Sequence, residues 1–266
     1  MNVVTDPGPL LAAFGTQTVA AFFLVLARVG PLFILAPLFS SRQLPGRVRG
    51  IIAVALAIGL SPVVSAGETV PTDVGNLFAL LAKEALVGLA FAFALGALFA
   101  AVTVAGSFLD TLIGFSYGGL IDPVTGNQSS LVSQLYSLVG VMIFIAIDGD
   151  ALVIRGLART YDTVGLTAYP DLKQLVSGTT AAFVQIFVAA IEIAGPVVLA
   201  LILTDAAFGV VSRVVPQLNV FAVGFPAKVT VGLVLMGATL PFVGGWLADE
   251  LQRDVGAALQ TIRVAG

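Results

Sequence analysis

Residues 85–109 read ALVGLAFAFALGALFAAVTVAGSFL, and this stretch decides the fold class. It contains no charged side chain, and about 20 mainly apolar residues are enough for one membrane-spanning helix. Strands of a membrane barrel alternate strictly between apolar and polar side chains, and no such alternation is present here. The stretch therefore predicts a helix in an all-α membrane protein.

The composition of the whole chain supports the same fold class. Hydrophobic residues make up 58% of the sequence, charged residues only 10%, and the mean hydropathy is +1.07. Ordinary soluble domains carry about 25% charged residues. Lipid or a large partner interface must therefore cover much of the surface. The net charge of −3 gives no indication of nucleic-acid binding.

The chain contains neither cysteine nor histidine. Disulfides, thiolate metal sites and cysteine nucleophiles are excluded, and the commonest general base and metal ligand is missing. We therefore predict no metal and no cofactor. The first basic residue is Arg28, so the N-terminal apolar run lacks the charged start of a signal peptide, and we expect it to be retained.

About six hydrophobic segments are long enough to be membrane helices or parts of them. They are Leu10–Phe39, Gly50–Gly67, Ala85–Leu109, Leu131–Ile147, Gly178–Thr204 and Val220–Ala248. Prolines interrupt the first and the last segment, and proline kinks or ends a helix. We expect several kinked or broken helices that form helical hairpins in a larger helical assembly.

Basic residues in the connecting segments do not set the topology. The arginines of the Ser40–Arg49 loop (Arg42, Arg47 and Arg49) are expected to face anionic headgroups on the cytoplasmic side. The Asp148–Lys173 segment, the longest polar connection, carries Arg155, Arg159 and Lys173 and falls on the opposite side in either orientation. Either one segment does not span the membrane or the chain does not insert as a simple serpentine.

Small residues recur at every fourth position of two segments, which lets helices approach closely. They are Gly88, Ala92, Gly96 and Ala100 in one segment, and Ala53, Ala57 and Ser61 in the other. We predict packing within this chain, with packing against other subunits as the alternative.

Ionisable side chains inside apolar segments are costly and often functional. Arg28 and Glu192 are the clear cases, and we predict that each pairs with a partner in the helical bundle. The alternative is that each lines a transport path. The Lys83–Glu84 doublet is predicted to lie at a solvated helix boundary.

The glycine-rich stretch Gly114–Asn127 contains GFSYG, which fits the G-x-S-x-G nucleophile elbow at Ser116. That mechanism needs a histidine base, which the chain lacks, so an intramembrane hydrolase is disfavoured. A flexible loop at membrane depth, tolerated where it is buried in protein or lines a watery path, is one interpretation. A plain surface loop is the other.

Residues 212–221, SRVVPQLNVF, predict a helical hairpin with a polar tip. Arg213 ends one apolar segment, and Pro216 cannot continue that helix. The amides of Gln217 and Asn219 can satisfy freed backbone groups or contact a partner subunit. The apolar run then restarts at Val220.

Two groups of motifs carry a resemblance to a known family. The first is ARVGP at 27–31, APLF at 36–39 and LPGRVR at 44–49; the second is SRVVPQLNVF at 212–221 followed by GFPAK at 224–228. Together they resemble the FliR family of flagellar biosynthetic proteins, which is related to the T subunits of virulence type III secretion systems. The resemblance covers nearly the whole chain, and its VGFP continuation favours the flagellar branch.

The resemblance implies a subunit of a protein-export gate in the bacterial inner membrane, at the flagellar basal body. Such a protein would conduct unfolded polypeptides and would not be an enzyme. Its partners would be the P and Q subunits, the B subunit, membrane lipid and the exported unfolded polypeptides. Residues 1–266 would form a single membrane-associated helical domain, with a P-subunit-like part at 1–175 and a Q-subunit-like C-terminal hairpin at 176–266. The helices of the assembled subunits would form a stack, and much of that stack would lie outside the bilayer plane. This would explain why the basic residues of the connecting segments do not set a topology.

The resemblance also implies that the central loop is a pore plug. The candidate plug residues are Gly114, Phe115, Ser116, Tyr117, Gly118, Gly119, Asp122, Pro123 and Asn127. Candidate assembly contacts fall in the motifs and the first apolar segment: Arg28, Arg47, Arg213, Pro216, Gln217, Asn219, Phe221 and Lys228. The alternatives are a virulence-type T subunit and a small-solute secondary transporter, the latter with a midplane site at Arg28 and Glu192.

Overall fold

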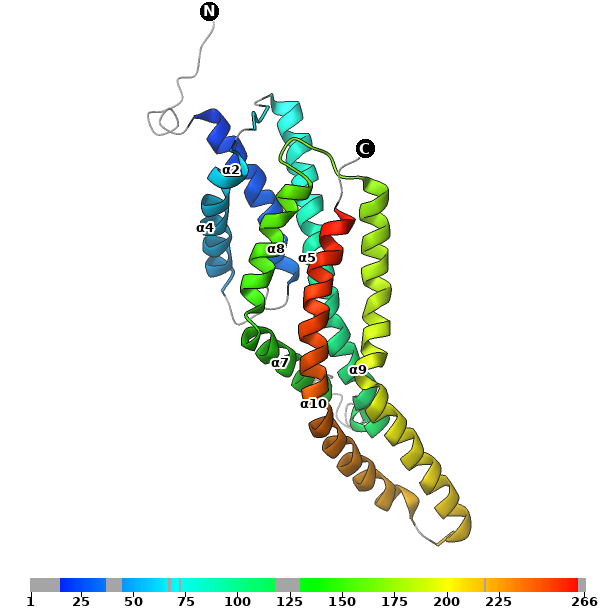
Figure 1. Ribbon diagram of the computed structural model, residues 1–266. Helices are drawn as coiled ribbons and strands as arrows, with labels where there is room; N and C mark the ends of the chain where they lie inside the picture. Colours follow the sequence, from blue (N-terminus) through cyan, green and yellow to red (C-terminus); the bar gives the residue numbers. More distant parts are fainter. Residues whose placement is uncertain are drawn as a thin grey trace, which may run out of the picture. The chain divides into compact units, whose positions relative to one another are not determined.

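The computed structural model describes residues 15–36, 45–66, 68–71, 73–117, 130–217 and 219–262. Every regular element in these ranges is helical, which confirms the predicted all-α fold (Figure 1). The elements are α2 (Thr16–Val29), α3 (Leu32–Leu35), α4 (Gly46–Val64), α5 (Val74–Ile113), the 3-10 helix η1 (Phe115–Tyr117), α7 (Leu131–Ala146), α8 (Gly149–Thr163), α9 (Leu172–Val214) and α10 (Val220–Thr261).

Five helices in the described ranges are long and apolar enough to cross a membrane, or six if α7 and α8 form one broken span. The break predicted at Pro31 separates α2 from α3, whereas α10 continues through Pro226 and Pro241. The prediction of a polar connection over Asp148–Lys173 was wrong, because residues 149–163 form α8. The break before α8 lies at Asp148, whose φ is 54°.

Four helices begin at a side chain that caps the first turn. Asp73 accepts a hydrogen bond from the Asn76 amide before α5, and Ser130 accepts one from Ser133 before α7. Likewise, Asp171 accepts from the amides of Lys173 and Gln174 before α9, and Asn219 accepts from Ala222 before α10. The first amides of a helix have no intrahelical partner, so these short polar residues define where each helix starts.

Contacts divide the chain into two compact units. Unit 1 comprises Met1–Gly96, Asp150–Ala182 and Arg253–Gly266, and unit 2 comprises Ala97–Gly149 and Phe183–Gln252. Helices α5, α9 and α10 contribute residues to both units. The predicted division of the chain at residue 175 stays a prediction.

In unit 1, α2 packs beside α4 (Figure 1), and the buried residues of α4 are Ala53, Ala57 and Ser61. On α5, a Cβ at Gly88 would overlap the backbone carbonyl of Arg28, and one at Gly96 would lie 3.3 Å from the Leu35 carbonyl oxygen. The small residues at these positions therefore serve packing within the chain, as predicted.

In unit 2, α7 begins against α5. A Cβ at Gly106 would lie 2.6 Å from the Cα of Ser133, so the two helices meet at this glycine. The later part of α9 and the first part of α10 run side by side as the two arms of a hairpin (Figure 1). A Cβ at Gly224 would lie 3.7 Å from the ring of Phe208 across these arms. The predicted helical hairpin is present.

We expect Gly88→Ala to lower the free energy of unfolding by about 1–3 kcal/mol, because the added methyl meets backbone atoms that cannot rotate away. The matched control is Gly59→Ala in α4, where nothing lies within 4 Å of the added Cβ. The control should be neutral or stabilising by up to about 1 kcal/mol. Unfolding of the detergent-solubilised protein measures both, and an unchanged stability for Gly88→Ala would contradict the close approach.

Candidate functional site

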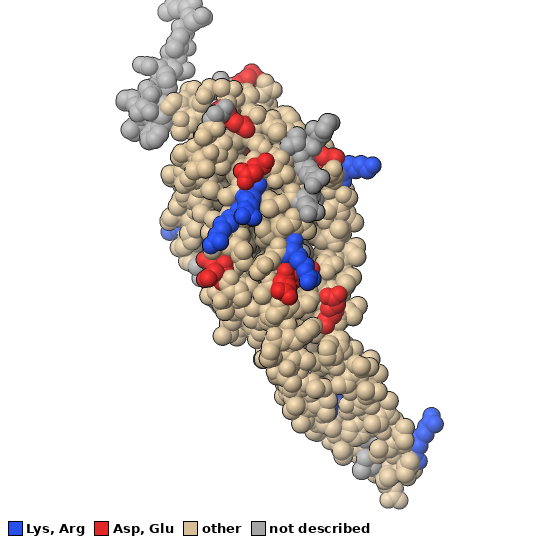
Figure 2. Space-filling view, in the orientation of Figure 1, with Lys and Arg blue, Asp and Glu red and all other residues tan. Residues whose placement is uncertain are grey.

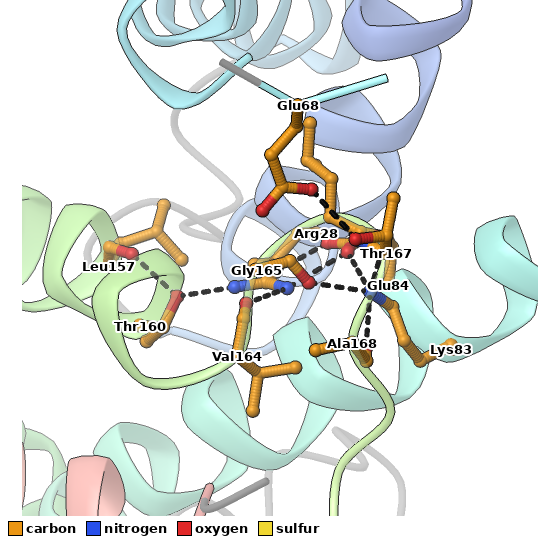
Figure 3. A network of polar contacts seen from close by, with 11 residues as sticks. Arg28, Glu68, Lys83, Glu84, Leu157, Thr160, Val164, Gly165, Thr167 and Ala168 are labelled. Atoms are coloured by element: carbon orange, nitrogen blue, oxygen red, sulfur yellow. Dashed lines mark hydrogen bonds and ion pairs between the residues drawn. The ribbon is translucent and has the colours of Figure 1, made fainter. Parts of the chain in front are cut away.

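The most extensive polar cluster of unit 1 is built around Arg28 of α2, which is fully buried (Figure 3). Its guanidinium donates to both carboxylate oxygens of Glu84 on α5, through Nε to Oε2 and through Nη2 to Oε1 at 2.9 Å. Nη1 donates to the Thr160 hydroxyl at 3.1 Å, and Nη2 donates to the Val164 carbonyl at 2.9 Å. The structure confirms the internal pairing predicted for Arg28.

Lys83 occupies a second position in the same cluster. Its ammonium nitrogen lies 2.6 Å from Glu84 Oε1 and donates to the carbonyl oxygens of Gly165, Leu166 and Ala168 at 2.8–3.0 Å (Figure 3). The predicted solvated boundary at Lys83 and Glu84 was wrong, because both side chains are buried. Carbonyl groups that lie more than 80 residues further along the chain accept the hydrogen bonds that Lys83 would donate to water at a solvated boundary.

The electrostatics of the cluster explain how two cations share one carboxylate. The carbonyl end of a helix carries partial negative charge, and α8 ends at Thr163, immediately before the carbonyls that Arg28 and Lys83 bind. The face of the Tyr161 ring also lies 3.9 Å from the Arg28 guanidinium carbon, which adds a cation–π contact. The cluster therefore joins α2, α5 and the turn after α8.

Glu68 closes the outer side of this turn. Its Oε2 accepts from the amide and the hydroxyl of Thr167, at 3.2 and 2.9 Å. A Cβ at Gly165 would lie 2.5 Å from Glu68 Oε1, so the glycine lets the carboxylate lie close to the turn without shifting. The turn after α8 is therefore bound from one side by Lys83 and from the other by Glu68.

Glu192, the other ionisable residue predicted to pair inside an apolar segment, lies in unit 2. Its carboxylate accepts a hydrogen bond from the Trp246 indole at 3.1 Å, so it too has a partner within the chain. Among the described residues, no group of three or more acidic side chains is arranged to hold a metal ion.

Only the first part of the candidate plug lies within the described residues. Gly114 follows α5 with a φ of 105°, a conformation that favours glycine, and Phe115–Tyr117 form η1. Ser116 donates to Asp110 at 2.9 Å, and Phe115 contacts Phe225 edge to face. The candidate residues Gly118, Gly119, Asp122, Pro123 and Asn127 lie outside the described ranges. The plug stays a prediction.

The hairpin tip between α9 and α10 exposes part of the predicted assembly surface. Arg213, Pro216 and Gln217 are exposed. Asn219 uses its side chain to cap α10, which is one of the two roles predicted for the tip amides. Nothing is described for the side chain of Phe221.

The remaining basic residues among the candidate assembly contacts differ in exposure and in pairing. Lys228 forms an ion pair with Asp205 at 2.9 Å and so links the arms of the hairpin. Arg47 lies exposed in the first turn of α4. Arg28 has no exposed surface in the isolated chain, so any effect that it has on assembly must act through the packing of unit 1. The assembly contacts stay predictions.

The fold and the cluster define a helical membrane protein whose buried charges hold its own helices together. Comparison with known proteins makes the class specific: the chain belongs to the family of bacterial export proteins, family 1, whose model matches residues 19–253. This match confirms the family resemblance that the sequence motifs carry.

Individual relatives cover most of the chain. It is 34% identical to the flagellar biosynthetic protein FliR of Bacillus subtilis, over 81% of this chain and 84% of the relative. It is 30% identical to FliR of Escherichia coli, over 84% and 85%. It is also 29% identical to the surface presentation of antigens protein SpaR of Shigella sonnei, over 77% and 81%.

We expect Glu84→Gln to lower the free energy of unfolding by about 3–5 kcal/mol, because it leaves Arg28 and Lys83 buried without their carboxylate. The control is Lys228→Met, which removes an ion pair whose Asp205 side chain is 51% exposed, and which should cost about 0–1 kcal/mol. Chemical unfolding in detergent compares the two variants. Equal costs would show that the buried cluster is not what stabilises unit 1.

Proposed function

We propose that this protein is a subunit of the flagellar type III protein-export gate in the bacterial inner membrane. In that role it helps to form the channel that passes unfolded flagellar proteins across the membrane. The observation that carries the proposal is the 34% identity to a flagellar biosynthetic protein over 81% of the chain. A gate subunit of this kind catalyses no reaction.

The exposed apolar surface supports a role in an assembly. Exposed large side chains occur along α9 from Leu172 to Val214. At 1.5 Å per residue, this 43-residue helix follows a path of about 65 Å, whereas the hydrocarbon core of a bilayer is about 30 Å thick. Lipid alone therefore cannot cover the helix, and neighbouring protein subunits are the natural cover.

We propose that the neighbours are the P and Q export-gate subunits, with the B subunit associated with them. Charged side chains are sparse on the visible face of the molecule, so apolar packing would dominate these contacts (Figure 2). Within the proposal, residues 1–175 form the P-subunit-like part, and residues 176–266 form the Q-subunit-like hairpin. The exposed tip residues Arg213, Pro216 and Gln217 are its contacts with neighbouring subunits, of which Arg213 and Gln217 are polar.

Virulence-type secretion is the second candidate function, because the 29% identity to SpaR covers 77% of this chain. The 34% identity to the flagellar relative of Bacillus subtilis exceeds the 29% identity to SpaR and favours the flagellar branch. The solute-transporter hypothesis has less support, because Arg28 and Glu192 each have hydrogen-bond partners within their own unit.

Deletion of the gene in its host should abolish the appearance of hook and filament proteins in the medium. The reason is that the export channel cannot form completely without this subunit. The intact gene should restore these proteins to the medium. Immunoblots of the medium and of the cell contents measure export separately from synthesis. Normal export in the deletion strain would exclude the flagellar assignment and would make virulence-type secretion the next assay.

A small deletion within Gly118–Asn127 should make the membrane leak ions, because the proposed plug would no longer fill the pore. The measurement is ion conductance, or growth on a permeant toxic salt, in cells with the assembled complex. A deletion of equal length at the N-terminus is the control. Unchanged conductance in a complex of normal yield would argue that the loop is not a plug.

A further inference from the structure

Asp110 is a buried carboxylate in the last turn of α5. The carbonyl end of a helix carries partial negative charge, so a carboxylate is disfavoured at this position. Burial adds the cost of removing the charge from water. The side chain therefore needs strong hydrogen-bond donors, and its partners show what the position is used for.

Its two oxygens accept hydrogen bonds from one residue that precedes residues 118–129 in the sequence and from one that follows them. Oδ2 accepts from the Ser116 hydroxyl at 2.9 Å, and Oδ1 accepts from the Val132 amide at 3.3 Å. Val132 is the second residue of α7, where the backbone amide has no intrahelical partner. Asp110 thus caps α7 from another helix, beside the cap that Ser130 provides at 3.0 Å.

The start of α7 has a second attachment to α5 that does not involve Asp110. The hydroxyls of Ser107 and Ser133 lie 2.7 Å apart, and Ser133 also donates to the Thr103 carbonyl at 3.0 Å. At Gly106 the two helices approach so closely that a Cβ would touch the Ser133 backbone. Because α7 is fixed in this way, the contact that Asp110 adds is the one to Ser116.

We propose that Asp110 is a positioning residue, which holds Ser116 close to the Val132 amide at the start of α7 and so fixes where the chain leaves α5. Both partners bind one carboxylate group, so they cannot separate while both bonds persist. In functional terms the inference rests on the proposed function, because residues 114–127 are the candidate pore plug. The anchoring itself concerns only Asp110, Ser116 and Val132.

The absence of cysteine from the chain makes a direct test possible. Tyr117→Cys and Leu131→Cys, the latter at an exposed position, place thiols at two positions that flank the anchor without removing either hydrogen bond. A short bifunctional maleimide, applied to the assembled complex that carries the full chain, reports how often these positions are close. On this background we compare Asp110→Ala, Ser116→Ala and the control Ser107→Ala.

We expect the cross-linking yield to fall severalfold in Asp110→Ala and in Ser116→Ala, and to stay near the parental value in Ser107→Ala. Ser116 is exposed, so its variant removes the anchor without disturbing the core and keeps the test valid if Asp110→Ala fails to assemble. Unchanged yields in Ser116→Ala, or in an assembled Asp110→Ala, would overturn the proposal.

Ion conductance of the same complexes separates this inference from the proposed function. If the plug exists, the two anchor variants should leak and Ser107→Ala should not. A fall in cross-linking without a leak would leave the anchoring by Asp110 in place and would count against the plug. Normal cross-linking together with a leak in Asp110→Ala would count against the anchoring.

Discussion

Unit 1 depends on the burial of the Arg28 guanidinium beside the Glu84 carboxylate. Glu84 and Gly88 lie four residues apart on α5 and therefore share one face of the helix. Glu84 receives the guanidinium of Arg28, and Gly88 leaves room for the backbone of the same residue. A side chain at position 88 would overlap the Arg28 backbone, so α2 can approach Glu84 this closely only because position 88 is a glycine.

Polar groups at the helix ends are also paired within the chain. In an apolar environment, a backbone amide without a partner costs several kcal/mol. Asp73, Ser130, Asp171 and Asn219 each supply an acceptor to the helix that they precede, and Asp110 supplies one to α7 from a distance. Only 10% of the residues are charged, and several of the polar side chains accept hydrogen bonds from backbone amides that have no partner within their helix.

The sequence was sufficient for the helical fold class, the apolar segments and the hairpin, because these follow from local patterns. It failed at Lys83, whose carbonyl partners lie in the turn after α8 and leave no mark near residue 83. It also missed α8, although the buried residues Val153, Leu157 and Tyr161 recur at helical spacing. The spacing of these residues could have predicted a helix, but the segment was interpreted as a connection because of its many polar residues. Asp110 ends an apolar segment, and only its distant partner Val132 reveals its role.

The distribution of polarity is the reverse of that in a soluble protein. The Arg28 cluster is buried, whereas Ile51 and Val63 on α4 and Val214 on α9 are more than 65% exposed. A solute-binding site needs convergent polar groups that are free to meet a ligand, but the hydrogen bonds of Arg28 and Lys83 go to their own chain. These charges therefore organise the fold of unit 1. Under the proposed function, the exposed apolar surfaces of α4 and α9 are therefore better candidates than these buried charges for contact with other subunits or with a transported polypeptide.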